Sequence, residues 1–291
     1  MSTESASTAQ TIFFYDRHPI SRDIILAKLR ASRGHLDGLR PEDIFPHDQD
    51  HYGGLAATDE LARAARISTG TCVADFCAGL GGTVRYLAWK YGADVTGIEL
   101  TPARVAGAGE LTRLVGLQAR ARVIEASVLE VPLADFSQDV VVSQEAFCHV
   151  PDRSKALGEA SRILKTHGRL AMTDWIGHEP LSSDDAQLLW DGMAIQPLET
   201  IGSYCDKAEA AGFHVLSATD LTDEWQPILK NRLAMYQTLR EEARDAGTPM
   251  GHDAFHRSYI RFVALVQERK LGGIRLVAEK RKPNTQSSQG G

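Results

Sequence analysis

The sequence has few cysteines, no surplus of basic residues and no long apolar run. Its four cysteines form no C-x-x-C pair, and its first ten residues lack the pattern of a secretory signal, so we expect free thiols in a reducing cytoplasm. Lys and Arg number 32 against 38 for Asp and Glu, so we expect no nucleic-acid partner. No window approaches the roughly 18 consecutive apolar residues of a membrane helix, so we expect no membrane association.

A metal site is not expected either. The stretch 47–51 crowds two histidines and two aspartates together, but it lacks the helical spacing that places two imidazoles on one ion. We therefore predict that the protein binds no metal.

What the chain does contain is an alternation of short apolar runs and helical stretches. Five apolar runs predict strands, at residues 72–76, 94–100, 121–126, 139–144 and 168–175. Helices are predicted between them at 82–91, 102–115 and 153–165, and two further strands at 213–221 and 274–280. This alternation is typical of a doubly wound α/β protein, here with a mostly parallel seven-stranded sheet.

The flanking segments predict four regions. Residues 1–57 would form an N-terminal helix, over 17–33, and a polar lid loop, with residues 1–10 as a frayed tail. Residues 58–221 would form the core, with Thr58 capping its first helix and a helical insert at 176–211. Residues 222–282 would add a helical cap, from helices at 223–247 and 252–270, and the last strand, before a disordered tail at 283–291.

The strongest motif is VADFCAGLGG at 73–82, a buried strand followed by glycines and a helix. Glycines allow positive φ and close approach of a ligand, and the start of the helix offers unpaired N–H groups. The next strand ends at Glu99, 20 positions after Gly79, where a carboxylate can accept both hydroxyls of a ribose. The pattern therefore predicts a cofactor of the adenosine type.

The spacing of the glycines argues against a nicotinamide dinucleotide. A G-x-G-x-x-G fingerprint starting at Gly79 would need glycine or alanine where Val84 stands, and a start at position 77 meets Cys77. An NAD-dependent oxidoreductase is therefore the alternative from outside the favoured class. A second such alternative is a catalytically silent protein that binds a cofactor.

The stretch D-x-C-A-G-L-G-G, with its acidic residue in the end of the strand, resembles motif I of class I S-adenosylmethionine-dependent methyltransferases. The resemblance extends over about residues 59–221 and implies a Rossmann-like sheet whose last strand is antiparallel. Cys77 replaces the first glycine of the family motif, and Ser127 stands where the family usually has an aspartate near adenine. The cofactor would be S-adenosylmethionine, and the implied binding residues are Asp75, Ala78, Gly79, Gly81, Glu99, Leu100, Ser127, Val128, Gln144 and Gln49.

Four residues are candidates for the methyl-transfer step. By resemblance, Glu145 and His149 follow the fourth strand beside the cofactor and could accept a proton or face a cationic substrate. Alternatively, Glu145 holds a loop and His149 caps the next helix. Tyr52, in the polar lid, could place its ring against the sulfonium, and Asp174 ends the fifth strand at the edge where such sheets bind ligands.

Aromatic residues of the cap region could line the pocket for the acceptor, although such residues more often pack in a core: Trp190, Tyr204, Trp225 and Tyr236. Within the family, the polar segment and the long insert are similar to the small-molecule branch, which includes sarcosine and dimethylglycine N-methyltransferases and natural-product enzymes. We therefore favour N- or S-methylation of an amino-acid-like metabolite, with C- or O-methylation of a hydrophobic natural product as the alternative. A homo-oligomer, with the N-terminal helix packed on a second subunit, is a further possibility.

Overall fold

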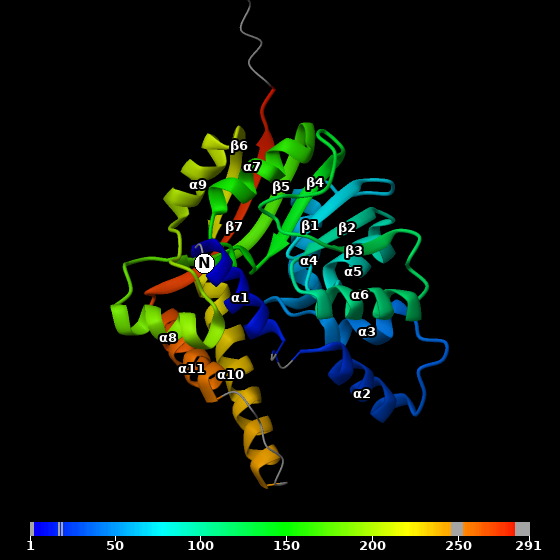
Figure 1. Cartoon of the computed structure of the whole chain (residues 1–291), viewed down its shortest axis with the longest axis vertical. Coiled ribbons are helices and arrows are strands. Elements are labelled where there is room, and N and C mark those ends of the chain that lie inside the picture. The colour runs from blue at the N-terminus through cyan, green and yellow to red at the C-terminus, as the bar shows by residue number, and fades with distance from the viewer. Residues whose placement is uncertain (1–2, 17, 19, 246–252, 283–291) are drawn as a thin grey trace, which may run out of the picture.

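The computed structural model describes residues 3–16, 18, 20–245 and 253–282. Its centre is one seven-stranded sheet in the order β3-β2-β1-β4-β5-β7-β6 (Figure 1). The strands are β1 (Cys72–Phe76), β2 (Asp94–Glu99), β3 (Ala121–Glu125), β4 (Gln138–Gln144), β5 (Leu164–Gly177), β6 (Phe213–Asp220) and β7 (Leu271–Lys280). Only β7 runs against its neighbours β5 and β6, so the predicted mostly parallel sheet with an antiparallel last strand is confirmed.

The two faces of the sheet bury different clusters because successive side chains of a strand point to opposite faces. On one face, Phe76 packs with residues of α7 (Arg153–Ile163) and α9 (Ile201–Ala210). On the other, Val73 packs with residues of α4 (Gly54–Ala64) and α5 (Gly82–Tyr91). Helix α6 (Pro102–Leu114) packs with α2 (Arg22–Arg33) and α3 (Pro41–Asp48) in a further cluster. The sheet is therefore covered on both sides, as in doubly wound proteins.

A helical cap gathers at one end of the sheet, at the lower left of Figure 1. It consists of α8 (Ser183–Met193), α10 (Thr222–Asp245) and α11 (Asp253–Gln267), which share a cluster that includes Trp175 at the end of β5. The α9 part of the predicted 176–211 insert lies against the sheet instead. The ends of the two predicted cap helices at 246, 247 and 252, like the predicted tail at 283–291, lie outside the described residues.

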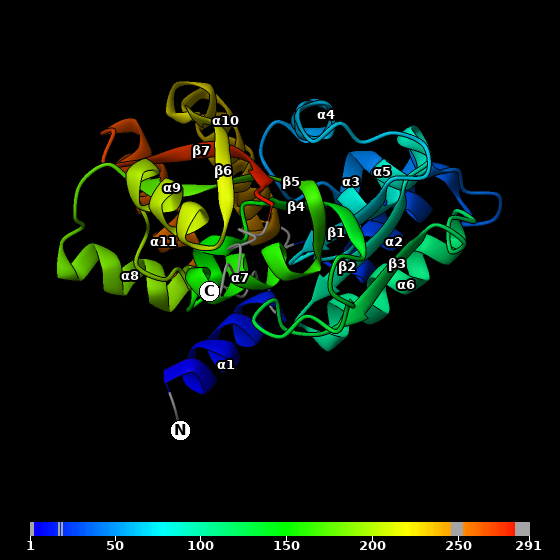
Figure 2. The ribbon, with the colours of Figure 1, turned by 90° about the horizontal axis from the view of Figure 1, so that it is seen from above.

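Three local predictions in the N-terminal region are wrong. Residues of the predicted frayed tail belong to α1 (Thr3–Tyr15), which buries Ser7 and Thr11 and lies on the outside of the molecule in Figure 2. Part of the predicted polar loop is the helix α3, which Pro41 can start because proline lacks only an N–H that has no partner in the first turn. Thr58 does not cap a helix: α4 begins after Gly53, and the Thr58 hydroxyl is buried inside the protein.

The polar segment is fixed to the core by a buried ion pair. Arg85 of α5 and Asp48 at the end of α3 are both inaccessible to solvent, and the Arg85 Nη2 atom donates to Asp48 Oδ2 at 2.7 Å. Arg85 Nη1 also donates to the Ala108 carbonyl and the Thr112 hydroxyl of α6. Three helices are thus joined around one guanidinium group, next to the glycine turn that precedes α5.

We expect Asp48→Asn to lower the free energy of unfolding by about 3 kcal/mol, because it leaves the Arg85 charge buried without a counter-charge. The matched control is Asp94→Asn, which breaks the exposed ion pair with Arg120 and should cost at most about 1 kcal/mol. Urea unfolding of both variants measures the difference. Equal losses in the two variants would show that the buried pair has no special weight.

Candidate active site

The predicted strand, glycine turn and helix are present, and the turn is built from left-handed backbone. Cys77, Gly79 and Gly81 have φ values of 61°, 55° and 75°. The N–H of Gly79 donates to Glu99 Oε2 at 2.9 Å, and the N–H of Thr101 donates to Glu99 Oε1 at 2.8 Å. Two backbone donors therefore fix the Glu99 carboxylate at the mouth of the turn, and each oxygen keeps a further lone pair for a ligand.

The turn opens into a cavity between the carboxyl ends of the parallel strands, the cap and α1. Most of the residues predicted for the site line it: Tyr52, Asp75, Ala78, Gly79, Glu99, Leu100, Ser127, Val128, Gln144, Glu145 and His149. These residues therefore lie together in the floor of one cavity. The ligand of these residues stays a prediction from the sequence.

Three predicted residues do not line this cavity. Side chains alternate along β5, so Trp175 faces the cavity while Asp174 is fully buried, accepting hydrogen bonds from the Tyr204 hydroxyl and the Cys148 N–H. Gly81 forms the N-cap of α5 with its α-carbon toward the interior. Gln49 donates to the Asp48 carboxylate and bonds to the His51 ring, both within the polar segment itself. These three residues therefore lie outside the lining of the cavity, next to residues that form it.

Glu145 has the contacts expected of a residue that holds a loop. Its Oε2 accepts the N–H of Tyr52 at 2.6 Å, and its Oε1 accepts the hydroxyl of Thr173 at 2.6 Å. Burial raises the pKa of Glu145 to about 7, although both hydrogen bonds act to lower it. Its φ of 46° is unusual for a residue other than glycine. A carboxyl group that titrates near neutrality therefore faces the cavity.

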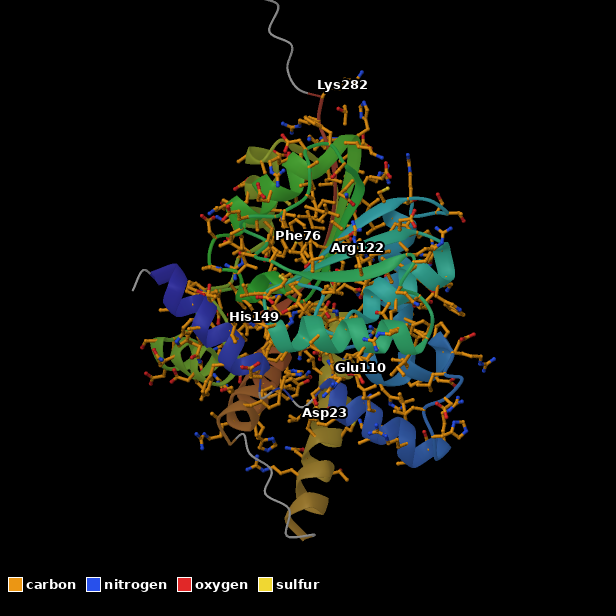
Figure 3. The ribbon with its side chains drawn as sticks, turned by 45° about the vertical axis from the view of Figure 1, so that its right-hand side comes forward. Asp23, Phe76, Glu110, Arg122, His149 and Lys282 are labelled. Carbon is orange, nitrogen blue, oxygen red and sulfur yellow. The ribbon has the colours of Figure 1, made fainter. Side chains whose placement is uncertain are left out.

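His149 does not cap the following helix. Asp152 is the N-cap of α7 and its carboxylate accepts the N–H of Lys155. The His149 ring lies against the Phe14 and Tyr15 rings of α1, at the place shown in Figure 3. Burial lowers the pKa of His149 to about 4, so the ring is neutral at pH 7 and can accept a proton only weakly.

Asp75 lies under the turn, 3% exposed. Burial and the nearby charge of Glu99 raise the pKa of Asp75 to about 8. Without a ligand the carboxyl is therefore mostly protonated at pH 7, and a positive group placed beside it would favour its charged form.

Several lining residues were missed by sequence reasoning. The helix α1 contributes Phe14 and Tyr15, and two arginines, Arg104 of α6 and Arg232 of α10, also line the cavity together with Asp50. The Ser- and Thr-rich start of α1 carries no apolar period that would reveal a packed helix. Of the cap aromatics, Tyr236 lines the cavity, whereas Trp190, Tyr204 and Trp225 do not.

Unpartnered polar atoms concentrate around this cavity. Among the described residues, seven buried side-chain atoms have no hydrogen-bond partner, and five of them belong to lining residues: Thr11, Arg104, Gln144, Trp175 and Tyr259. Buried polar groups in folded proteins are almost always paired. The cavity therefore has the donors that a polar ligand would satisfy.

The described residues contain no group of three or more His, Cys, Asp or Glu side chains that could hold a metal ion. No helix in the described part of the chain is long and apolar enough to cross a membrane.

Comparison with known proteins decides what the core is. Residues 74–172 match the family model described as a methyltransferase domain. This segment is a methyltransferase domain. It contains the end of β1, the glycine turn, Glu99 and Glu145, so the floor of the cavity belongs to it.

Relatives of the methyltransferase domain act on different molecules. The chain is 31% identical over 181 residues to a glycine/sarcosine/dimethylglycine N-methyltransferase of Actinopolyspora halophila, covering 62% of this chain and 32% of that protein. It therefore spans about a third of that relative. It is 27% identical over 226 residues to the 27-O-demethylrifamycin SV methyltransferase of Amycolatopsis mediterranei, covering 77% of this chain and 82% of that protein.

A solved structure titled as a sarcosine dimethylglycine methyltransferase from Galdieria sulphuraria matches with a TM-score of 0.70. It is 24% identical and covers 78% of this chain and 86% of that one. At this identity the likeness shows that the fold is shared.

Cys77 stands where the family motif has glycine, so substitutions at this position test whether the turn is strained. A left-handed residue with a Cβ atom is strained by roughly 1–2 kcal/mol, so we expect Cys77→Gly to be more stable than Cys77→Ala by about 1 kcal/mol. At Cys205, inside α9, the order should reverse by a similar ~1 kcal/mol, because glycine is a poor helix former. Chemical denaturation of the four variants measures both differences. The same order at both positions would contradict the assignment of strain to the turn.

Proposed function

We propose that the protein transfers a methyl group from S-adenosylmethionine to a small molecule bound under the cap. The observation that carries the proposal is the continuity between the glycine turn, with Glu99 fixed at its mouth, and an aromatic cavity that reaches Glu145. A binding site for an adenosine-type cofactor and a possible proton acceptor thus lie in one enclosed space.

The residues present fit the cofactor. Gly79 has a positive φ, which favours glycine, and an added Cβ would make a tight contact of 3.1 Å with Arg104 Nη1. Glu99 offers carboxylate lone pairs to ribose hydroxyls, and the unpartnered Nε2 of Gln144 offers a donor. Leu100 and Val128 supply apolar walls for adenine, and the Ser127 hydroxyl accepts the Leu129 N–H and keeps its own hydrogen for a bond.

When bound, S-adenosylmethionine supplies an electrophilic methyl group on a sulfonium. The protein's contribution is then to orient the acceptor for in-line attack, exclude water and remove a proton where the nucleophile carries one. Tyr52 and Trp175 stack nearly parallel, with ring centroids 6.3 Å apart, and form an aromatic part of the cavity wall. Glu145 takes the proton, and neutral His149 packs the wall that α1 closes.

For the acceptor we favour the nitrogen of an amino-acid-like metabolite, with sulfur as the second possibility. Support comes from the named substrates of the relative in Actinopolyspora halophila and from Glu145, which can accept the proton of an ammonium or amine. The alternative is C- or O-methylation of a hydrophobic natural product. It is supported by the aromatic lining and by the longer match to the rifamycin enzyme.

Two further expectations belong to this proposal. A cytoplasmic location is supported by four cysteines that form no disulfide. A homo-oligomer stays a prediction, but α2, the helix expected to reach a second subunit, buries its apolar face against α3 and α6 of its own chain.

Calorimetric titration with S-adenosylmethionine, S-adenosylhomocysteine and NAD tests the cofactor site. We expect the first two to bind and NAD not to. Glu99→Gln should weaken binding by roughly 10- to 100-fold, since a hydrogen bond to a charged group contributes about 1.5–3 kcal/mol. The control is Glu125→Gln, an exposed position aligned with Glu99 on the neighbouring strand. Binding of NAD alone would mean that the turn is a dinucleotide site.

The role of Glu145 is tested by the pH dependence of kcat/KM with an accepted substrate. A base whose pKa is about 7 is active only when deprotonated, so the rate should rise with pH through about 7 and then level off. Glu145→Gln should remove this limb and lower kcat/KM by roughly 10²- to 10⁴-fold. Gln can still accept from Tyr52 and pair with the rotating Thr173 hydroxyl, so cofactor affinity should stay unchanged. An unaltered pH profile in the variant would exclude Glu145 as the proton acceptor.

A further inference from the structure

Two guanidinium groups face the cavity from different elements. Arg104, from the first turn of α6, stacks on the Tyr15 ring at 4.3 Å and donates to the Ile20 carbonyl at 3.2 Å. Arg232, from α10, lies over the Tyr52 ring at 5.3 Å and donates to the Asp50 carbonyl at 3.2 Å. Each planar cation is held in a fixed orientation by an aromatic face and one backbone carbonyl.

The only carboxylate within ion-pair distance of either arginine, among the described residues, is that of Asp50. It lies 3.7 Å from Arg104 Nη1 and 4.0 Å from Arg232 Nη2, and both distances exceed that of a hydrogen bond. His18, 3.6 Å from Asp50, accepts the N–H of Ile20 at Nδ1 and is therefore neutral in this arrangement. The two guanidinium groups thus share the single carboxylate of Asp50, and this carboxylate forms a hydrogen bond with neither of them.

Arg104 also has an unused donor. Its side chain is 6% exposed, and its Nε atom is buried without a hydrogen-bond partner. A buried charged donor without a partner is costly, and a guanidinium fork suits the two oxygens of a carboxylate or phosphate. The vacant donor therefore points to an oxyanion as ligand.

We propose that Arg104 and Arg232 bind an oxyanion group of the methyl acceptor, so that the site selects small acceptors carrying a carboxylate or a phosphate. This inference rests on the proposed function and names the substrate class of the same site. Arg232 lies over the ring of Tyr52, and Glu145 accepts the N–H of the same residue at 2.6 Å, so one anion-binding group and the proposed proton acceptor are both held by Tyr52.

The test measures binding of acetate and of inorganic phosphate to the protein loaded with S-adenosylhomocysteine, by calorimetry. We expect saturable binding of at least one of them, and the better ligand tells whether the acceptor is a carboxylate or a phosphate compound. Arg104→Gln and Arg232→Gln should each weaken it by 10-fold or more. Arg232→Lys should keep part of it, because it retains the charge but loses the fork. Lys230→Gln, two residues away on the exposed side of α10, removes the same charge and should change nothing.

The second arm distinguishes the acceptor from the cofactor's own carboxylate. Each variant is titrated with S-adenosylhomocysteine and with 5′-methylthioadenosine, which lacks the amino-acid part. Unchanged affinity for both shows that the variants fold and that the arginines do not bind the cofactor, so a loss of acetate or phosphate binding in the same variants assigns the arginines to the acceptor. If the variants lose S-adenosylhomocysteine but keep methylthioadenosine, the arginines bind the cofactor and the inference is overturned. A wild-type complex that binds neither acetate nor phosphate also overturns it, whereas failure of wild type to bind S-adenosylhomocysteine would defeat the proposed function itself.

Discussion

The buried pair of Arg85 and Asp48 is the interaction on which the geometry of the cavity depends. It joins the glycine-turn helix to the end of α3, and the next four residues of the chain lead directly to Tyr52. The fit is close, because a Cβ on Gly82 would lie 2.3 Å from the Asp48 carbonyl oxygen. A buried ion pair is weak evidence for added stability, since apolar residues of similar volume often serve as well. Here the pair matters for its geometry. Its hydrogen bonds set the direction and distance of the polar segment relative to the turn, which an apolar contact would not do.

The residues that follow Asp48 contact both the two arginines and Glu145. Asp50 lies between the two arginines, and the N–H of Tyr52 is held by Glu145 at 2.6 Å. This stretch of five residues therefore connects cap and core in addition to the apolar packing of the cap helices on Trp175 of β5 and Leu271 of β7. A change in this stretch would alter the anion-binding groups and the proton acceptor together.

The sequence predicted the parts that depend on local pattern. The strand from 72 to 76, the glycine turn and Glu99 follow from the alternation of apolar runs and from the backbone freedom of glycine, and all three stand where they were expected. Asp174 was misplaced, although the alternation of side chains along β5 already separates it from Trp175. The role of α1 could not be found this way, because its buried Ser7 and Thr11 resemble the residues of an exposed segment. The directions in which the side chains of Arg104 and Arg232 point depend on how α6 and α10 pack. No local pattern in the sequence predicts this packing.

The buried ionisable groups indicate what kind of charge the cavity favours in a ligand. Burial raises the pKa of Asp75 to about 8 and that of Glu145 to about 7, so folding keeps their protons and their contribution to stability is lost as pH rises through those values. Burial lowers the pKa of His18 and His149 to about 4, so their contribution is lost as pH falls from about 6.5 toward 4. Near pH 7 the histidines are neutral and the two carboxyls are close to their titration points. A cationic ligand beside Asp75 would therefore release a proton on binding, whereas an anion at the two arginines would not. One cavity thus combines carboxyl groups that a cation would help to ionise with two guanidinium groups that suit an anion, which agrees with the proposed pairing of a sulfonium cofactor and an acidic acceptor.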